Sequence, residues 1–132
     1  MYSGTYTVLL VDDDENLLLG LKRRLKSKIC KIITAVSAAE AIGHLQSYDI
    51  DLVLCDYKMP GTNGMELLEI LKSTYPDVLR MMLSGCIGSD NAWKVVEEIG
   101  VSHFFSKPSD ASKIAQVIDL AIEKKANVSV SV

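Results

Sequence analysis

The sequence predicts a single α/β domain in which five parallel strands form one sheet in the order 2-1-3-4-5, with five helices covering both faces. Short apolar, β-prone runs alternate five times with segments of helical periodicity, which is typical of a parallel sheet joined by right-handed crossovers. The first and third runs are almost wholly apolar, as central strands should be, whereas the second and fifth contain polar residues typical of edges. A length of 132 residues fits one domain.

Helical periodicity and capping signals fill the intervals between the strands. The predicted strands lie at about 6–11, 32–36, 52–55, 78–83 and 101–105. The first helix follows from apolar residues at helical spacing, which are Leu18, Leu21, Leu25 and Ile29. Ser37, with Glu40 three residues later, predicts a capping box at the start of the second helix. Pro76 and Gly100 predict the ends of the third and fourth helices.

The last part of the sequence predicts where the domain ends. A helix is expected from about Asp110 to Lys125, because apolar residues recur there at helical spacing. Residues 126–132 show no helical period and are expected to form a loose tail. The predicted domain therefore covers residues 1–125.

Composition excludes several classes of protein. Hydrophobic residues make up 48% of the chain and charged residues 23%, which argues against intrinsic disorder. Seventeen acids against fourteen bases give a net charge of −3, which argues against direct binding of nucleic acid. The three cysteines form no CxxC pair, as expected of reduced thiols rather than of a disulfide or zinc site. The early apolar run at 8–11 is too short for a signal peptide or a membrane span, so a cytoplasmic protein is expected.

Polar residues lie at or just beyond the ends of four predicted strands. Asp12 and Asp13 follow the first strand, and Asp56 follows the third. Ser84 follows the fourth strand, and Lys107 comes shortly after the fifth. Ligands of such sheets bind beyond the carboxyl ends of the strands, at the switch point between the first and third. We therefore expect these five residues to converge on one site.

The residue types predict the chemistry of that site. Three carboxylates held close together repel one another unless a cation joins them, and their oxygens suit a hard divalent ion such as Mg²⁺, with Mn²⁺ as an alternative. A carboxylate beside such an ion and a lysine can attack a phosphoryl group, because the cations neutralise the oxygens on which charge develops. The pattern therefore favours a site at which an aspartate becomes phosphorylated. Asp14 is expected to be a helix N-cap rather than a metal ligand.

Four segments together resemble the signatures of a response-regulator receiver domain, which has a flavodoxin-like, doubly wound fold. They are VLLVDDDENLL, DLVLCDYKMPGTNGMELL, RMMLSGC and FFSKP. The resemblance covers about residues 6–125 and implies a switch in a two-component phosphorelay. A histidine kinase or a phosphotransfer protein would donate the phosphoryl group, and an output domain or effector protein would respond. The resemblance also allows a phosphorylation-dependent homodimer, and it implies no catalysis beyond the domain's own phosphorylation and dephosphorylation.

The resemblance gives roles to the residues around the acid pocket. Asp56 matches the phosphoacceptor, and Asp12 and Asp13 match the acidic pair that serves the metal ion. The main-chain carbonyl of Lys58 is implied as a further metal ligand. The Lys58 side chain occupies a variable position that is expected to tune the rate of dephosphorylation.

The resemblance also implies the residues that respond to phosphorylation. Ser84 and Lys107 match the phosphoryl-binding switch positions, and Phe104 matches the switch aromatic. Phenylalanine has no hydroxyl, so it cannot form the hydrogen bond that the commoner tyrosine makes. Cys86 occupies a second variable position that is expected to tune dephosphorylation. Trp93 lies on the implied output face, which consists of the fourth helix, the fifth strand and the fifth helix.

Three other functions are consistent with parts of the sequence. A flavin-binding protein would share the fold, but the three aspartates after the first strand would repel the flavin phosphate. A haloacid-dehalogenase-like phosphatase would carry its nucleophile in a DxDx(T/V) motif after the first strand, where this chain has DDDEN. A receiver fold used only for docking or dimerisation, without phosphorylation, is the remaining alternative.

Overall fold

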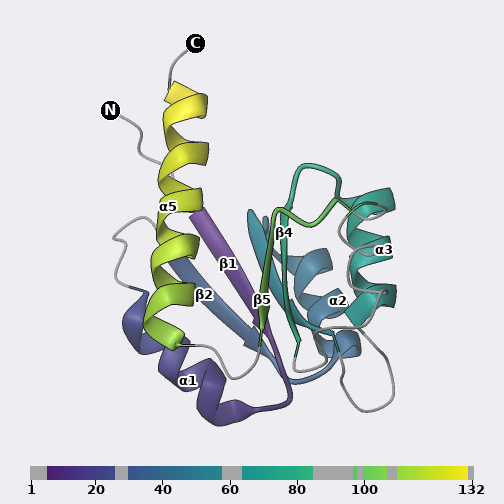
Figure 1. Cartoon of the computed structure of the whole chain (residues 1–132). Coiled ribbons are helices and arrows are strands. Elements are labelled where there is room, and N and C mark those ends of the chain that lie inside the picture. The colour runs from purple at the N-terminus through teal and green to yellow at the C-terminus, as the bar shows by residue number, and fades with distance from the viewer. Residues whose placement is uncertain are drawn as a thin grey trace.

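A five-stranded parallel sheet lies at the centre of the molecule. The computed structural model describes residues 6–25, 30–57, 64–84, 97, 100–106 and 110–130. Its strands are β1 (Tyr6–Val11), β2 (Cys30–Ala35), β3 (Leu52–Asp56), β4 (Leu79–Ser84) and β5 (His103–Ser106). All neighbouring strands pair in parallel, in the order β2-β1-β3-β4-β5 (Figure 1). This order confirms the predicted topology, with β2 and β5 at the edges.

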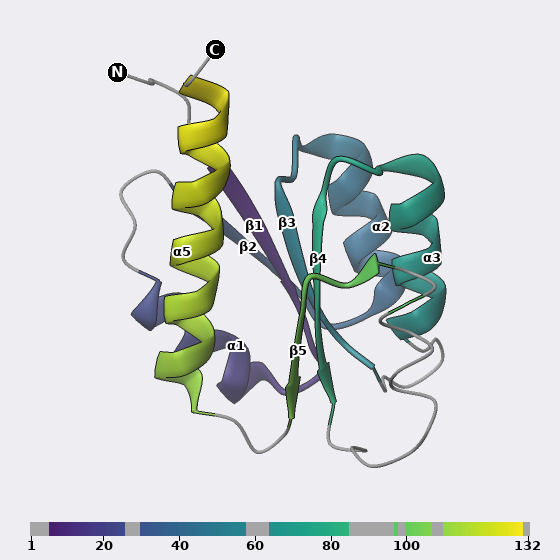
Figure 2. The same ribbon diagram turned by 45° about the horizontal axis from the view of Figure 1, so that its top comes forward.

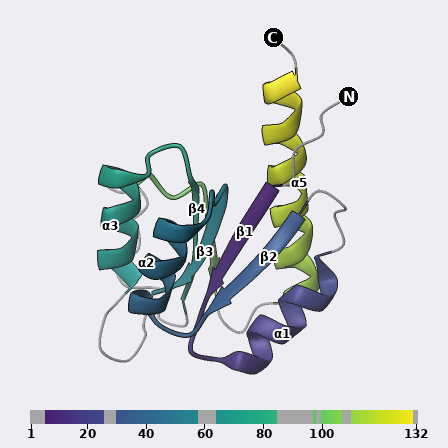
Figure 3. The same ribbon diagram turned by 180° about the vertical axis from the view of Figure 1, so that it is seen from behind.

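Helices cover both faces of the sheet, as predicted. They are α1 (Glu15–Arg24), α2 (Ala38–Ser47), α3 (Gly64–Thr74) and α5 (Ala111–Val130). Helices α1 and α5 lie on one face and α2 and α3 on the other, as the front and back views show (Figures 1 and 3). The fourth predicted helix falls on residues 85–99, of which the structure describes only Glu97. Gly100 has a φ of 74°, the left-handed conformation expected of a glycine that ends a helix.

Each face of the sheet has its own hydrophobic core, because successive residues of a strand point to opposite sides. In β1, Val8 and Leu10 belong to the core on the α1–α5 side, whereas Leu9 and Val11 belong to the core on the α2–α3 side. Strand β3 is buried over its whole length, as expected of a strand covered on both faces. Figure 2 shows the sheet between the two helical layers. This packing fixes the strand ends from which the candidate site is built.

Two helix caps fix the loops that follow β1 and β2. The Asp14 carboxylate accepts hydrogen bonds from the amides of Asn16 and Leu17 at 3.1 and 3.2 Å, which confirms its predicted role as the N-cap of α1. The Ser37 hydroxyl accepts a hydrogen bond from the Glu40 amide at 3.2 Å, which confirms the N-cap of α2. Both caps satisfy amide groups that the first turn of a helix leaves without helical partners.

Two helix ends differ from the predictions. Helix α1 ends at Arg24, although the apolar spacing continued to Ile29, and the Leu25 amide closes its last turn. Helix α5 continues to Val130, so the predicted loose tail is wrong for residues 126–130. No glycine or proline occurs between Ala111 and Val130, so no residue of α5 removes a backbone donor or strongly disfavours the helix. The lack of a helical apolar period in residues 126–130 therefore does not indicate the end of this helix.

Candidate functional site

Three aspartates meet at the carboxyl edge of the sheet, between β1 and β3. Asp12 and Asp13 follow β1 directly, and Asp56 is the last residue of β3. The register of these neighbouring strands pairs Val11 with Cys55, which brings Asp12 opposite Asp56. One carboxylate oxygen of each aspartate lies within 4.8 Å of the others. The structure therefore brings together the three acids that the strand ends predicted.

Backbone hydrogen bonds hold the first of these acids in place. The Asp12 amide donates to the carbonyl of Ala35, at the end of β2, at 3.0 Å. Its Oδ1 accepts a hydrogen bond from the Asp14 amide at 2.9 Å. Asp12 is 2% exposed and Asp56 5%, whereas Asp13 is exposed. The cluster thus consists of two buried acids and one at the rim, with Asp14 turned toward α1 as its cap.

The chemistry of this donor set fits a hard divalent cation. Carboxylates this close repel one another, and burial strengthens the repulsion because less water screens it. Mg²⁺ and similar ions bind carboxylate oxygens of this kind and keep several of their own waters. Asp12, Asp13 and Asp56 would hold such an ion, and the exposed Asp13 side of the cluster faces solvent.

Cys55 is a further neighbour of the site, one that the pattern of polar residues at the strand ends does not predict. It is buried, and its Sγ donates to the main-chain carbonyl of Asp56 at 3.3 Å. Burial raises the pKa of the Cys55 thiol, and the charges of Asp56 and Asp12 raise it further. The thiol therefore stays protonated near neutral pH and is a poor nucleophile. Its place in the apolar run of β3 was the signal that it packs beside the acids.

Comparison with known proteins identifies the family. A family model described as "Response regulator receiver domain" matches residues 8–119. The chain belongs to this family. The match includes both strand ends that carry the aspartates, so the acidic cluster lies inside the receiver domain.

Relatives of this receiver include regulators of transcription. The transcriptional regulatory protein GlrR of Escherichia coli K12 is 34% identical over 119 residues, which are 90% of this chain and 27% of GlrR. The hydrogenase transcriptional regulatory protein HoxA of Cupriavidus necator is 31% identical over 117 residues, which are 89% of this chain and 24% of HoxA. The chain therefore spans about a quarter of the length of these curated relatives.

Solved receiver structures share the fold. The signal receiver domain of an HD domain-containing protein from Pseudomonas fluorescens Pf-5 superimposes with a TM-score of 0.83 at 27% identity, over 93% of this chain and 98% of that domain. The described helices of the present receiver include none with the length and apolar character needed to cross a membrane.

The remaining residues predicted for the receiver site are described in part. Ser84 ends β4, the neighbour of β3, so its backbone lies at the same edge as Asp56. The Ser84 side chain lies outside the described residues. Phe104 lies beside Met82 in the register of β5 and β4, and it packs half-buried against the core on the α2–α3 side. Four further predicted residues lie outside the described part of the chain, namely Lys58, Cys86, Trp93 and Lys107.

Proposed function

We propose that this receiver is a phosphorylation-activated switch of a two-component phosphorelay, with Asp56 as the phosphoacceptor. The observation that carries the proposal is the cluster of three carboxylates around the buried Asp56, at the switch point of the sheet. A histidine kinase or a phosphotransfer protein would supply the phosphoryl group. The relatives include a protein named sensor kinase CckA, from Brucella abortus, which is 30% identical over 93% of this chain.

Transfer would begin at the carboxylate of Asp56. One of its oxygens would form a bond to phosphorus while the P–N bond to the donor histidine breaks and the leaving imidazole takes up a proton. Asp12, Asp13, Asp56 and the main-chain carbonyl of Lys58 would hold Mg²⁺, or Mn²⁺ in its place. The ion would supply positive charge that offsets the repulsion between the carboxylates and the incoming phosphoryl oxygens. Strands β1 and β3 already hold the acids together, so little rearrangement is needed for transfer.

The new charge at Asp56 would drive the response. Phosphorylation adds roughly one to two negative charges and several strong hydrogen-bond acceptors. The Ser84 hydroxyl and the Lys107 ammonium would be drawn toward the phosphoryl group. Phe104 would then turn inward and alter the surface formed by the fourth predicted helix, β5 and α5.

Three further residues have proposed roles around this switch. The Lys58 and Cys86 side chains would flank the phosphoryl group and tune its rate of hydrolysis. Trp93 would lie on the altered surface and contact a partner. If so, the fluorescence of Trp93 should change on phosphorylation, and an unchanged spectrum would count against a switch at that surface.

The partners of this receiver are proposed from its relatives. GlrR and HoxA are named transcriptional regulatory proteins, whereas the Pseudomonas receiver belongs to an HD domain-containing protein. We propose that residues 1–125 form the regulatory unit and that an output domain or effector protein responds to it, with a phosphorylation-dependent homodimer as one form of response. The receiver itself would act in the cytoplasm, without nucleic acid or membrane contact, and catalyse only its own phosphorylation and dephosphorylation.

Intact-mass spectrometry tests the proposal. The protein is incubated with acetyl phosphate or phosphoramidate, with and without Mg²⁺, and then weighed. We expect one added phosphoryl group on the wild type and on Asp14→Asn, and none on Asp56→Ala. No added phosphate on the wild type would overturn the proposal in favour of a receiver fold used only for docking, and equal labelling of Asp56→Ala would remove Asp56 as the acceptor.

A further inference from the structure

A set of hydrogen bonds around Asp51 joins the starts of three strands, at the edge of the sheet opposite to the acidic cluster. Asp51 directly precedes β3. Its amide donates to the carbonyl of Thr7 in β1 at 2.8 Å, and its carboxylate Oδ2 accepts a hydrogen bond from the Thr7 amide, also at 2.8 Å. Its carbonyl accepts a hydrogen bond from the amide of Leu79 in β4 at 2.9 Å. Asp51 is therefore bonded to both strands that flank β3.

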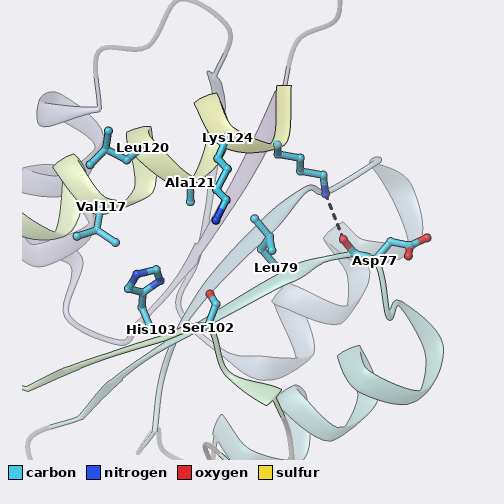
Figure 4. A pocket seen from close by; sticks show the side chains of 9 residues that line it. Asp77, Leu79, Ser102, His103, Val117, Leu120, Ala121 and Lys124 are labelled. Carbon is cyan, nitrogen blue, oxygen red and sulfur yellow. Dashed lines mark hydrogen bonds between the residues drawn. The ribbon is translucent and has the colours of Figure 1, made fainter. Parts of the chain in front are cut away.

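Lys125 of α5 also contacts Asp51. Its ammonium donates to the main-chain carbonyls of Asp51 and Asp77 at 3.3 and 3.1 Å and lies 3.7 Å from the Asp51 carboxylate. The dashed line that ends at Asp77 in Figure 4 marks the second of these bonds. The Asp51 side chain is only 24% exposed, and its carboxylate is in contact with both this ammonium and the Thr7 amide. The two contacts together fix the orientation of the carboxylate.

The apolar side chains of β1 and β3 do not by themselves fix how these two strands align. The observed register pairs residues 8–11 with residues 52–55, and all eight of these residues are apolar. A shift by one residue would turn every side chain to the wrong face of the sheet, but a shift by two would leave each on its own face. Apolar residues would still meet apolar residues after such a shift. A polar contact at the strand starts can exclude it, because only one register brings Asp51 to the Thr7 amide.

We propose that Asp51 is a positioning residue for the acidic cluster, because its paired bonds with Thr7 set the register of β1 and β3. Residues advance about 3.3 Å along a strand, so a shift by two would move Asp56 about 6.6 Å along β1. This displacement exceeds the 4.8 Å within which oxygens of Asp12, Asp13 and Asp56 lie. The three carboxylates can therefore hold one cation together only in the register that Asp51 selects.

Asp51 acts on this site from a distance. Asp56 is five residues further along β3, or about 16 Å away, so Asp51 does not touch a cation or a phosphoryl group bound there. Strand β3 is buried over its whole length, and its close packing transmits the position of one end to the other. The inference rests on the proposed function only for the role of the site that Asp51 positions. The affinity of the acidic cluster for a divalent cation can be measured without any phosphorylation.

Binding of Mn²⁺ to the full chain, followed by electron paramagnetic resonance, tests the role of Asp51. Asp51→Ala removes the acceptor of the Thr7 amide. Asp51→Asn keeps an acceptor oxygen in place but removes the charge, whereas Asp51→Glu keeps the charge but moves the carboxylate one methylene group away. Ile118→Val is the control for a general loss of stability, because it removes a buried methyl group from α5 and no hydrogen bond. Circular dichroism shows whether each variant is folded, and amide hydrogen exchange reports how firmly β1 pairs with β3.

We expect Asp51→Ala to raise the dissociation constant for Mn²⁺ about ten-fold and to speed the exchange of β1 amides, because a small displacement of the carboxylates weakens their joint grip on the ion. Asp51→Glu should raise the constant about three-fold, whereas Asp51→Asn and Ile118→Val should bind Mn²⁺ like the wild type.

Four results would overturn the proposal. The first is an unchanged dissociation constant in Asp51→Ala, or in Asp51→Glu if the alanine variant does not fold. The second is an equal rise in Ile118→Val, and the third is a rise in Asp51→Asn equal to that in Asp51→Ala, which would make charge the cause. The fourth is a wild type that binds no Mn²⁺. Binding of Mn²⁺ that depends on Asp51, in a protein that phosphoramidate does not label, would support this inference and refute the proposed phosphorylation.

Discussion

Neutralising Asp56 should stabilise the fold when no divalent cation is present. Asp56→Asn keeps the shape of the side chain but removes one of three charges whose oxygens lie within 4.8 Å of one another. Two unit charges at that separation repel by about 0.9 kcal/mol in bulk water and by about 3.5 kcal/mol at an effective dielectric constant of about 20. Asp12 is buried like Asp56, so the repulsion between these two carboxylates lies toward the upper value. Asp13 is exposed, so its repulsion of Asp56 lies toward the lower value. We expect the free energy of unfolding to rise by about 1 to 3 kcal/mol.

Urea unfolding followed by circular dichroism measures this effect, in EDTA and again in Mg²⁺. Metal binding to the native wild type adds about 1.4 kcal/mol at ten times the dissociation constant, so the advantage of Asp56→Asn should shrink or reverse in Mg²⁺. Asp14→Asn is the matched control, because it removes a nearby charge outside the cluster and asparagine caps a helix as well as aspartate. An Asp56→Asn protein no more stable than the wild type in EDTA, or an equal gain from Asp14→Asn, would refute the reasoning.

Other parts of the fold give three further predictions. Ser37→Ala should lower the free energy of unfolding by about 1 kcal/mol, because it removes the cap of α2, and Ser37→Asp should restore it in the same urea assay. Lys125→Met should cost about 1 to 2 kcal/mol through two lost hydrogen bonds from a charged donor, and a similar loss in Lys124→Met would contradict this. Burial raises the pKa of the Cys55 thiol above its ordinary value of 9.0. The preference of the folded state for the protonated thiol therefore contributes fully to the free energy of unfolding below pH 9, and this contribution is lost as the pH rises above 9. With the other cysteines changed to serine, the native Cys55 thiol should resist alkylation at pH 8, where rapid labelling would contradict its burial.

Most of the fold could be predicted from local patterns along the chain. Strand β1 begins and ends where the apolar run Tyr6–Val11 does, and the caps at Asp14 and Ser37 lie where the residue types indicate them. The strand order follows from which runs are wholly apolar, because strands covered on both faces need apolar residues throughout. That order then places Asp12 and Asp56 together, so the acidic cluster was predictable without any knowledge of side-chain contacts.

Other features depend on contacts between segments that are distant in sequence. The Lys125 ammonium reaches Asp51 and Asp77 only because α5 crosses the starts of β3 and β4, and no local pattern shows that crossing. A groove lined by Leu79 of β4, His103 of β5 and Leu120 of α5 likewise depends on how far these three elements lie from one another, which no local pattern indicates. The length of α5 was missed for a different reason. The sequence of residues 126–130 shows no apolar period, and helix continuation there follows from the absence of a glycine or proline rather than from periodicity.

The central claim, that Asp56 accepts a phosphoryl group, is tested most directly by locating the modified residue. After incubation with phosphoramidate and Mg²⁺, borohydride reduces an acyl phosphate to an alcohol, so a phosphorylated aspartate becomes homoserine. Peptide mass spectrometry then identifies the position. We predict homoserine at position 56 alone, and only in samples that contained Mg²⁺. Homoserine at Asp12 or Asp13, or none at all, would contradict the account.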